Sequence, residues 1–157
     1  MKKLLFLIFA LPLLTVVTAS CDNDGNVPNV DIKMSYANAT VVDSKVYVVK
    51  PDTLIVKSVT VTAVDKGHAA TNGPVTYWFD GVPVLTNPVA PFGVKIPTDD
   101  LEVGKYALQF SMPVYEEGCE LATAAGAITV NVVGSPDDIP ESSGGDSSEA
   151  HVGYTLQ

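Results

Sequence analysis

Apolar and polar residues alternate over several short stretches between Val30 and Val133. Strict alternation places successive side chains on opposite faces of a β-strand, one face in a core and the other toward solvent. The clearest alternating apolar sets are Tyr106, Leu108, Phe110 and Met112; Phe92, Val94 and Ile96; and Ile128, Val130 and Val132. The pattern therefore predicts three strands that each bury one face.

Other stretches predict strands by their residue types. Leu54 to Val64 is rich in Val, Thr and Ile, which favour strands over helices. Val75 to Phe79 ends at the turn pair Asp80-Gly81, after which a short strand through Val84 returns. Two further apolar runs cover 30–36 and 46–49, and no stretch combines a helical period with caps. About seven short strands with frequent Gly and Pro predict an all-β antiparallel sandwich over residues 30–133.

The first 20 residues have the organisation of a secretory signal. Lys2 and Lys3 precede an apolar run from Leu4 to Val17, and small residues follow up to Ser20. The run contains Pro12 and is shorter than the roughly 20 apolar residues that a membrane-spanning helix needs. The sequence therefore predicts an exported protein and disfavours a transmembrane helix.

Cys21 directly follows Thr18-Ala19-Ser20, and this order resembles the lipobox of bacterial lipoproteins. The resemblance implies that residues 1–20 are removed and that Cys21, as the new first residue, carries the acyl chains. Two or more such chains, palmitate among them, hold a protein stably on a membrane. An ordinary secreted protein that is cut elsewhere is the alternative.

An acidic stretch, Asp22-Asn23-Asp24, follows Cys21. It is similar to the signal that sends some lipoproteins to the outer face of the outer membrane, although an aspartate there retains lipoproteins at the inner membrane in other Gram-negative groups. We expect an outer-membrane lipoprotein exposed at the cell surface. The polar residues 21–29 read as a flexible tether, since a calcium loop would need further carboxylates. The Ser-, Gly- and Asp-rich residues 134–157 predict a disordered tail, although residues 151–157 are slightly more apolar and leave a weak final strand open.

Three motifs follow one another between residues 54 and 133. An aromatic strand ends at Asp80-Gly81, Pro91-Phe92 opens another strand, and Leu101-x-x-Gly104-x-Tyr106 enters a third. This order resembles the immunoglobulin-like domains of bacterial cell-surface proteins. Tyr106 fits a tyrosine corner, in which the hydroxyl bonds to backbone just upstream. Such domains serve adhesion, sugar binding and spacing alike, so the resemblance predicts the fold better than the function.

Charge and cysteine content exclude several classes of function. All 18 acidic residues follow position 21, so losing two lysines with the signal takes the net charge from −9 to −11. An acidic chain without Arg is a poor ligand for nucleic acid. With Cys21 lipidated, Cys119 has no disulfide partner, and the carboxylates beside it disfavour its thiolate. We expect an unreactive thiol.

Trp78 is the only tryptophan and the main candidate for recognition. If Val75, Tyr77 and Phe79 fill the core, Trp78 points outward, where it offers a platform for a sugar ring or a protein partner. The alternative is a tryptophan in the core or covered by a loop. A second candidate is Thr53 in Asp52-Thr53-Leu54, which resembles a short O-glycosylation motif of exported bacterial proteins.

The remaining polar groups predict no catalysis. Asp99-Asp100 and Glu116-Glu117 read as solvated loop carboxylates, and His68 as an exposed histidine. We find no nucleophile–base pair, metal cluster or phosphate loop, and predict a protein without enzymatic activity, metal or cofactor. The favoured function is a binding or adhesion module for a glycan or an envelope protein. The alternative is a structural, assembly or spacer subunit of a surface complex.

Overall fold

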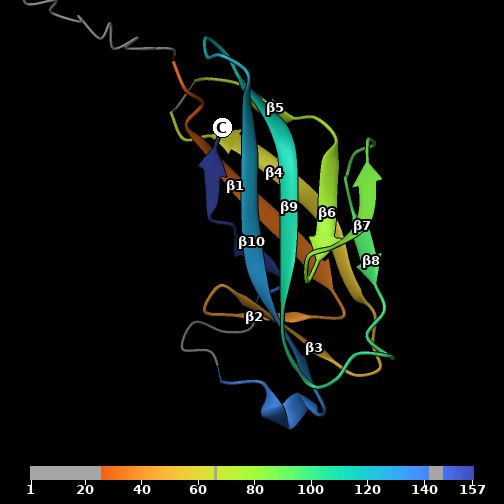
Figure 1. The fold of residues 1–157 in the computed structure, drawn as a ribbon. Helices are drawn as coiled ribbons and strands as arrows, with labels where there is room; N and C mark the ends of the chain where they lie inside the picture. The colour runs from red at the N-terminus through yellow and green to blue at the C-terminus, as the bar shows by residue number, and fades with distance from the viewer. Residues whose placement is uncertain (1–25, 66, 142–146) are drawn as a thin grey trace, which may run out of the picture.

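The computed structural model describes residues 26–65, 67–141 and 147–157. The predicted signal and Cys21 lie outside these ranges. Within them, no helix is both long and apolar enough to span a bilayer. The strands form two sheets that pack face to face (Figure 1).

The smaller sheet has four strands in the order β11-β1-β4-β8, all antiparallel. Their bounds are Glu149–His151 for β11, Val30–Ala37 for β1, Leu54–Ala63 for β4 and Val94–Ile96 for β8. β1 and β4 pair over eight register positions and form the centre of this sheet.

The larger sheet has the order β2-β3-β10-β9-β6-β7. The bounds are Thr40–Val42 for β2, Lys45–Val49 for β3, Ala122–Val133 for β10, Gly104–Glu116 for β9, Val75–Phe79 for β6 and Val82–Asn87 for β7. Two short strands complete it: β5 (Ala70–Asn72) pairs with β9, and β12 (Tyr154–Leu156) pairs with β10. β3 runs parallel to β10, and the other pairs are antiparallel. A short 3₁₀ helix follows β10 at Pro136–Asp138.

Apolar residues of the alternating sets in the sequence are buried in the core. Leu108, Phe110 and Met112 on β9 are buried, as are Val94 and Ile96 on β8. Ile128, Val130 and Val132 on β10 are buried as well. The prediction of an all-β, immunoglobulin-like sandwich is confirmed, with more strands than the roughly seven expected because several are only three residues long.

Two local predictions hold in detail. The Tyr106 hydroxyl donates to the Glu102 carbonyl at 2.9 Å, so Tyr106 forms the expected corner. Its ring also stacks on Phe79, with the centroids 5.4 Å apart. Asp80 and Gly81 both have positive φ, 49° and 80°, which is the backbone that a tight hairpin between β6 and β7 requires.

The prediction of a disordered tail over 134–157 is wrong for the last part of the chain, where β12 forms the weak final strand that the sequence left open. β11 pairs with β1, and β12 pairs with β10, so residues 147–157 cross from one sheet to the other and close that side of the sandwich. Ala150 and Val152 are buried in the core. A Cβ at Gly126 of β10 would lie 2.4 Å from the Gly153 carbonyl oxygen, so this close approach requires glycine.

The flexible-tether prediction also needs correction for residues 26–29. The Asn26 carbonyl accepts from the Glu120 amide at 2.9 Å, and the Asn29 carbonyl accepts from the Val64 amide at 2.9 Å. The Asn29 amide donates to Glu116 Oε2 at 2.6 Å. Pro28 is buried, so the chain is fixed to the domain from residue 26 onward.

Candidate functional site: the outer face of the larger sheet

Trp78 lies on the outer face of the larger sheet, as the alternation predicts. Its neighbours Tyr77 and Phe79 are buried in the core, whereas Trp78 is half-buried and pairs with Pro83 of β7 and Gln109 of β9. The core alternative for Trp78 is therefore wrong. The indole lies between two flanking strands and keeps part of its surface open to solvent.

Around Trp78 the outer face carries no charged side chain over several cross-strand rows. One row runs Thr86, Thr76, Ser111, Ala125 and Thr155 across five strands. The row of Trp78 continues through Gln109 to Ala127, and the rows on either side pair Ala107 with Thr129 and Pro113 with Thr123. We call these residues the neutral face. A chain with 18 acidic residues would be expected to carry charge on so large an area.

The polar groups of the neutral face are small and partly engaged already. Thr76 Oγ1 lies 3.1 Å from Thr86 Oγ1, and the Gly81 amide donates to Gln109 Oε1 at 3.0 Å. These bonds hold the side chains beside the indole in place. A rigid aromatic ring among hydroxyl and amide groups suits a ligand with an apolar ring face and polar edges.

The sequence identified Trp78 but not its surroundings. The outward positions on β9 follow from the same alternation as the buried ones, so Gln109 and Ser111 were recognisable as surface residues. Which outward residues of β7, β10 and β12 join them depends on strand order and register. No local pattern carries that information.

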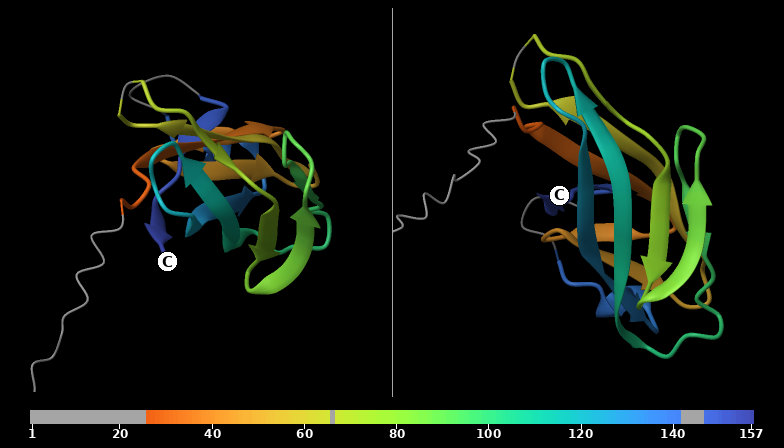
Figure 2. Two further views of the ribbon diagram at one scale, coloured as in Figure 1. Left: turned by 90° about the horizontal axis from the view of Figure 1, so that it is seen from above. Right: turned by 45° about the horizontal axis from the view of Figure 1, so that its top comes forward.

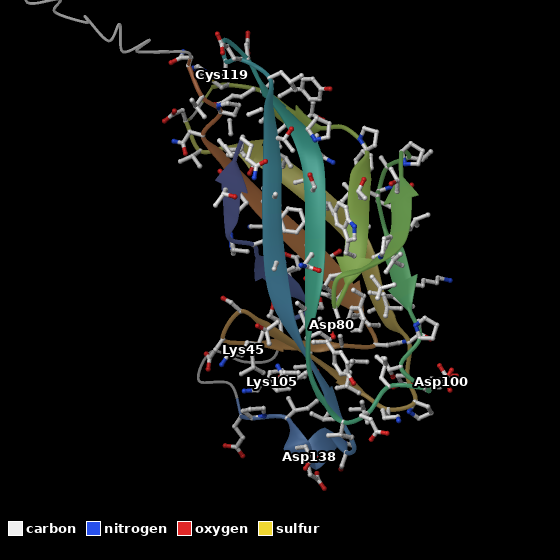
Figure 3. The ribbon with its side chains drawn as sticks, in the orientation of Figure 1. Lys45, Asp80, Asp100, Lys105, Cys119 and Asp138 are labelled. Atoms are coloured by element: carbon white, nitrogen blue, oxygen red, sulfur yellow. The ribbon has the colours of Figure 1, made fainter. Side chains whose placement is uncertain are left out.

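Cys119 lies at the end of the domain where residue 26 enters (Figure 3). His68 and Glu116 come together with it there. The Cys119 thiol donates to Glu116 Oε2 at 3.6 Å, and His68 Nδ1 lies 3.9 Å from Glu116 Oε1. Desolvation, followed by the Glu116 charge, raises the pKa of Cys119. The prediction of a poorly ionised thiol is confirmed.

Glu116 itself differs from the expectation of a solvated loop carboxylate. It is the last residue of β9, is only 7% exposed, and binds the Asn29 amide. The cluster therefore fixes the N-terminal segment to the β9–β10 hairpin. Its histidine is exposed, and the pKa of its thiol is raised, whereas an activated thiol nucleophile has a lowered pKa.

The other predicted sites are surface or strand-edge positions. Thr53 is half-buried and directly precedes β4, at the strand entrance where the sequence placed it. Asp99 and Asp100 are exposed in a turn before β9, and Glu117 is exposed at the opposite end of that strand. Asp100 lies far from Cys119, near the end that also carries Asp138 (Figure 3). In the described ranges, no group of three or more His, Cys, Asp or Glu residues could hold a metal ion.

Comparisons with protein-family models, with curated proteins and with solved structures found no match to this chain.

Proposed function

We propose that the chain is a lipid-anchored recognition protein of the bacterial outer membrane, attached through Cys21 and exposed at the cell surface. Its immunoglobulin-like sandwich binds a neutral glycan on the neutral face around Trp78 and performs no catalysis. The lipobox-like start supports the anchoring, and the neutral face supports the binding.

The observation that carries the glycan assignment is the half-exposed Trp78 on a charge-free face of hydroxyl and amide side chains. Sugar rings combine apolar faces with hydroxyl edges, so an indole and neighbouring Thr, Ser and Gln groups match both parts. A net charge of −11 after processing would repel an acidic polysaccharide, and this favours a neutral one.

The test measures binding of soluble residues 22–157 to neutral and acidic polysaccharides from bacterial envelopes and host surfaces. We expect saturable binding to a neutral glycan that Trp78→Ala reduces at least tenfold and Trp78→Phe reduces less. Val103→Ala is the matched control, because Val103 is 62% exposed and lies just before β9, away from the neutral face. Binding that survives Trp78→Ala, or that occurs only with acidic glycans, would overturn the assignment.

Anchoring is tested separately by labelling cells with a radioactive fatty acid. The full chain should incorporate the label, and Cys21→Ser should abolish it. Surface exposure is read from protease treatment of intact cells. An unlabelled wild-type chain would refute the anchor without bearing on the glycan.

A structural or assembly subunit is the second candidate, and one observation favours it. β7 and β8 are the last strands of their sheets, and within the described residues each pairs with a strand on one side only. Open strand edges of this kind are places where another chain adds a strand.

A further inference from the structure

A groove runs along the side of the sandwich where β7 and β8 end the two sheets. These strands lie next to each other (Figures 1 and 2). They belong to different sheets, and no hydrogen-bonded ladder joins them. The main part of the groove has a volume of about 810 Å³ and lies between Val84 and Leu85 on one side and Ile55, Lys57 and Lys95 on the other. This volume is in the range of ligand sites, roughly 300–1,000 Å³.

A second section of about 420 Å³ continues the groove toward the far end of the domain. Val84 and Lys95 line both sections, so they form one elongated depression. Val82, Pro83, Leu101 and Tyr106 add further apolar wall to the second section. Val82, Val84 and Leu85 are 65%, 41% and 45% exposed, which is unusual for large apolar residues on one strand.

The groove is rigid at the end where β7 passes to β8. Asn87 Nδ2 donates to the Gly93 carbonyl at 2.9 Å, and the buried Tyr77 hydroxyl donates to the Phe92 carbonyl at 2.7 Å. The Pro91 carbonyl accepts from the Val59 amide at 3.0 Å. The connection between the two edges is therefore tied to both sheets, and the groove is a preformed feature.

The main section of the groove carries positive charge on an acidic molecule, whereas Asp80 adds a carboxylate to the wall of the second section. Lys57 and Lys95 are exposed and line the main section, and no carboxylate lines that section. Within the described ranges neither lysine forms an ion pair, since the ion pairs found there are His68–Glu116 and His151–Asp31. Two free ammonium groups on so acidic a chain favour an occupant with carboxylates.

The walls also offer backbone groups. Alternate N–H and C=O groups of an edge strand point away from its single partner, so β7 and β8 present unpaired donors and acceptors. Pro83 and the irregular register at Trp78 protect the start of β7, which leaves the part from Leu85 to Asn87 regular. A lipid tail could not satisfy these groups, whereas an extended peptide could.

We propose that this groove binds an extended segment of a partner protein in which apolar residues alternate with acidic ones. The segment adds as a strand to the edge of β7 or β8, buries its apolar side chains against Val84, Leu85 and Ile55, and pairs its carboxylates with Lys57 and Lys95. The opposite side of the domain shows the same solution in one chain, where β11 alternates the exposed Glu149 and His151 with the buried Ala150. This inference is independent of the glycan assignment to Trp78.

The experiment uses soluble residues 22–157 and three synthetic peptides of seven residues. One alternates Val with Glu, one alternates Val with Lys, and one contains the residues of the first in two blocks. Fluorescence anisotropy of the labelled peptides measures binding. We expect the alternating acidic peptide to bind at least tenfold more tightly than the other two.

Two changes separate strand addition from charge attraction. Two N-methylated versions of the acidic peptide are compared, one methylated at the odd-numbered amides and one at the even-numbered amides; these are its two phases. Only one set of amides faces the strand edge, so methylation should abolish binding in one phase and leave it intact in the other. The double substitution Lys57→Glu with Lys95→Glu should reverse the preference toward the lysine peptide. The control is the double substitution Lys45→Glu with Lys105→Glu, at exposed lysines near the end of the domain that carries Asp138 (Figure 3). It changes the net charge by the same amount and should leave the preference for the acidic peptide unchanged.

Equal binding of the acidic and lysine peptides would overturn the proposal. So would binding that both phases of N-methylation spare, which would indicate attraction without strand addition. Tight binding of laurate in place of any peptide would assign the groove to a lipid.

Discussion

The two lateral sides of this sandwich end differently. On one side, residues 147–157 pair first with β1 and then with β10, and so cover the edges of both sheets. On the other side, β7 and β8 lie next to each other with a groove between them and no strand across it. The same two sheets thus have one closed side and one open side.

The difference shows what closing a sheet edge requires. The closing segment is short and only Ala150 and Val152 are buried in it, yet main-chain pairing and the glycine contact at Gly126 are enough to seat it. The open side leaves three larger apolar residues exposed, Val82, Val84 and Leu85. An added strand there could bury at least as much apolar surface as the closing segment does, and the described residues supply no such strand.

Removing residues 147–157 should have the largest effect on the comparison, since it opens the closed side. Buried Ala150 and Val152 and the packed Tyr154 and Leu156 are lost, and the edge of β1 is exposed. We expect a loss on the order of 5 kcal/mol, which is a third or more of the stability of a typical domain. Urea denaturation followed by circular dichroism would check this, and Glu149→Ala, an exposed change in the same segment, should unfold like the wild type.

One substitution made on each side compares them directly. Ala150→Asp places a carboxylate where the residue is 5% exposed, and should cost about 3 kcal/mol because the charge has no partner there. Leu85→Asp on the open side, at a residue 45% exposed, should cost less than about 1 kcal/mol. The free energies of unfolding of the two variants test the pair. Equal losses would mean that the open side is already covered in solution.

Tyr154→Phe probes the closed side without altering its volume. The Tyr154 hydroxyl donates to the Val30 carbonyl and accepts from the Val30 amide at 3.3 Å, which joins the end of the chain to the start of β1. Without it both backbone groups lose a partner, and we expect a loss of about 1–2 kcal/mol. Thermal unfolding gives the value. Tyr115→Phe, at a 46% exposed tyrosine, is the control and should be neutral.

The smallest effect is expected at Cys119, which lies at the tether end and on neither side. Because burial and the Glu116 charge raise its pKa, less thiolate is present at pH 8 than in an ordinary cysteine. Alkylation of Cys119 by iodoacetamide should be several-fold slower than that of a model thiol. Its rate should continue to increase at pH values above those at which the rate of the model thiol has levelled off. Glu116→Gln should speed it, and Leu85→Asp should not. A wild-type rate equal to that of the model thiol would contradict the assignment.

The contrast between the two sides also marks the limit of sequence reasoning. Strands such as β6 and β9 were predictable because each carries its own apolar face, and the Tyr106 corner followed from residues four apart. β11 was missed because it is three residues long and its partner β1 lies more than 100 positions away. β12, which pairs with β10, falls in the final segment where the sequence left a weak strand open. Glu116 was taken for a solvated group because its partners Asn29 and Ala70 lie on segments far from it in the sequence. The groove could not be predicted either, since it exists because no further strand of the described residues pairs with β7 or β8.

The attachment of residues 26–29 has a mechanical consequence. A pull on the N-terminal end reaches the domain first at Asn26, which bonds to the β9–β10 hairpin, and then at Asn29, from which it passes into β1. β1 pairs with β4 on one side and β11 on the other. If the opposing force acts at the far end of the domain, the pull is directed along β1. The eight paired positions that β1 shares with β4 are then loaded at the same time and not one after another. The closing segment pairs with the other side of the same strand, so both ladders of β1 have to break before this strand can be drawn out of the sheet.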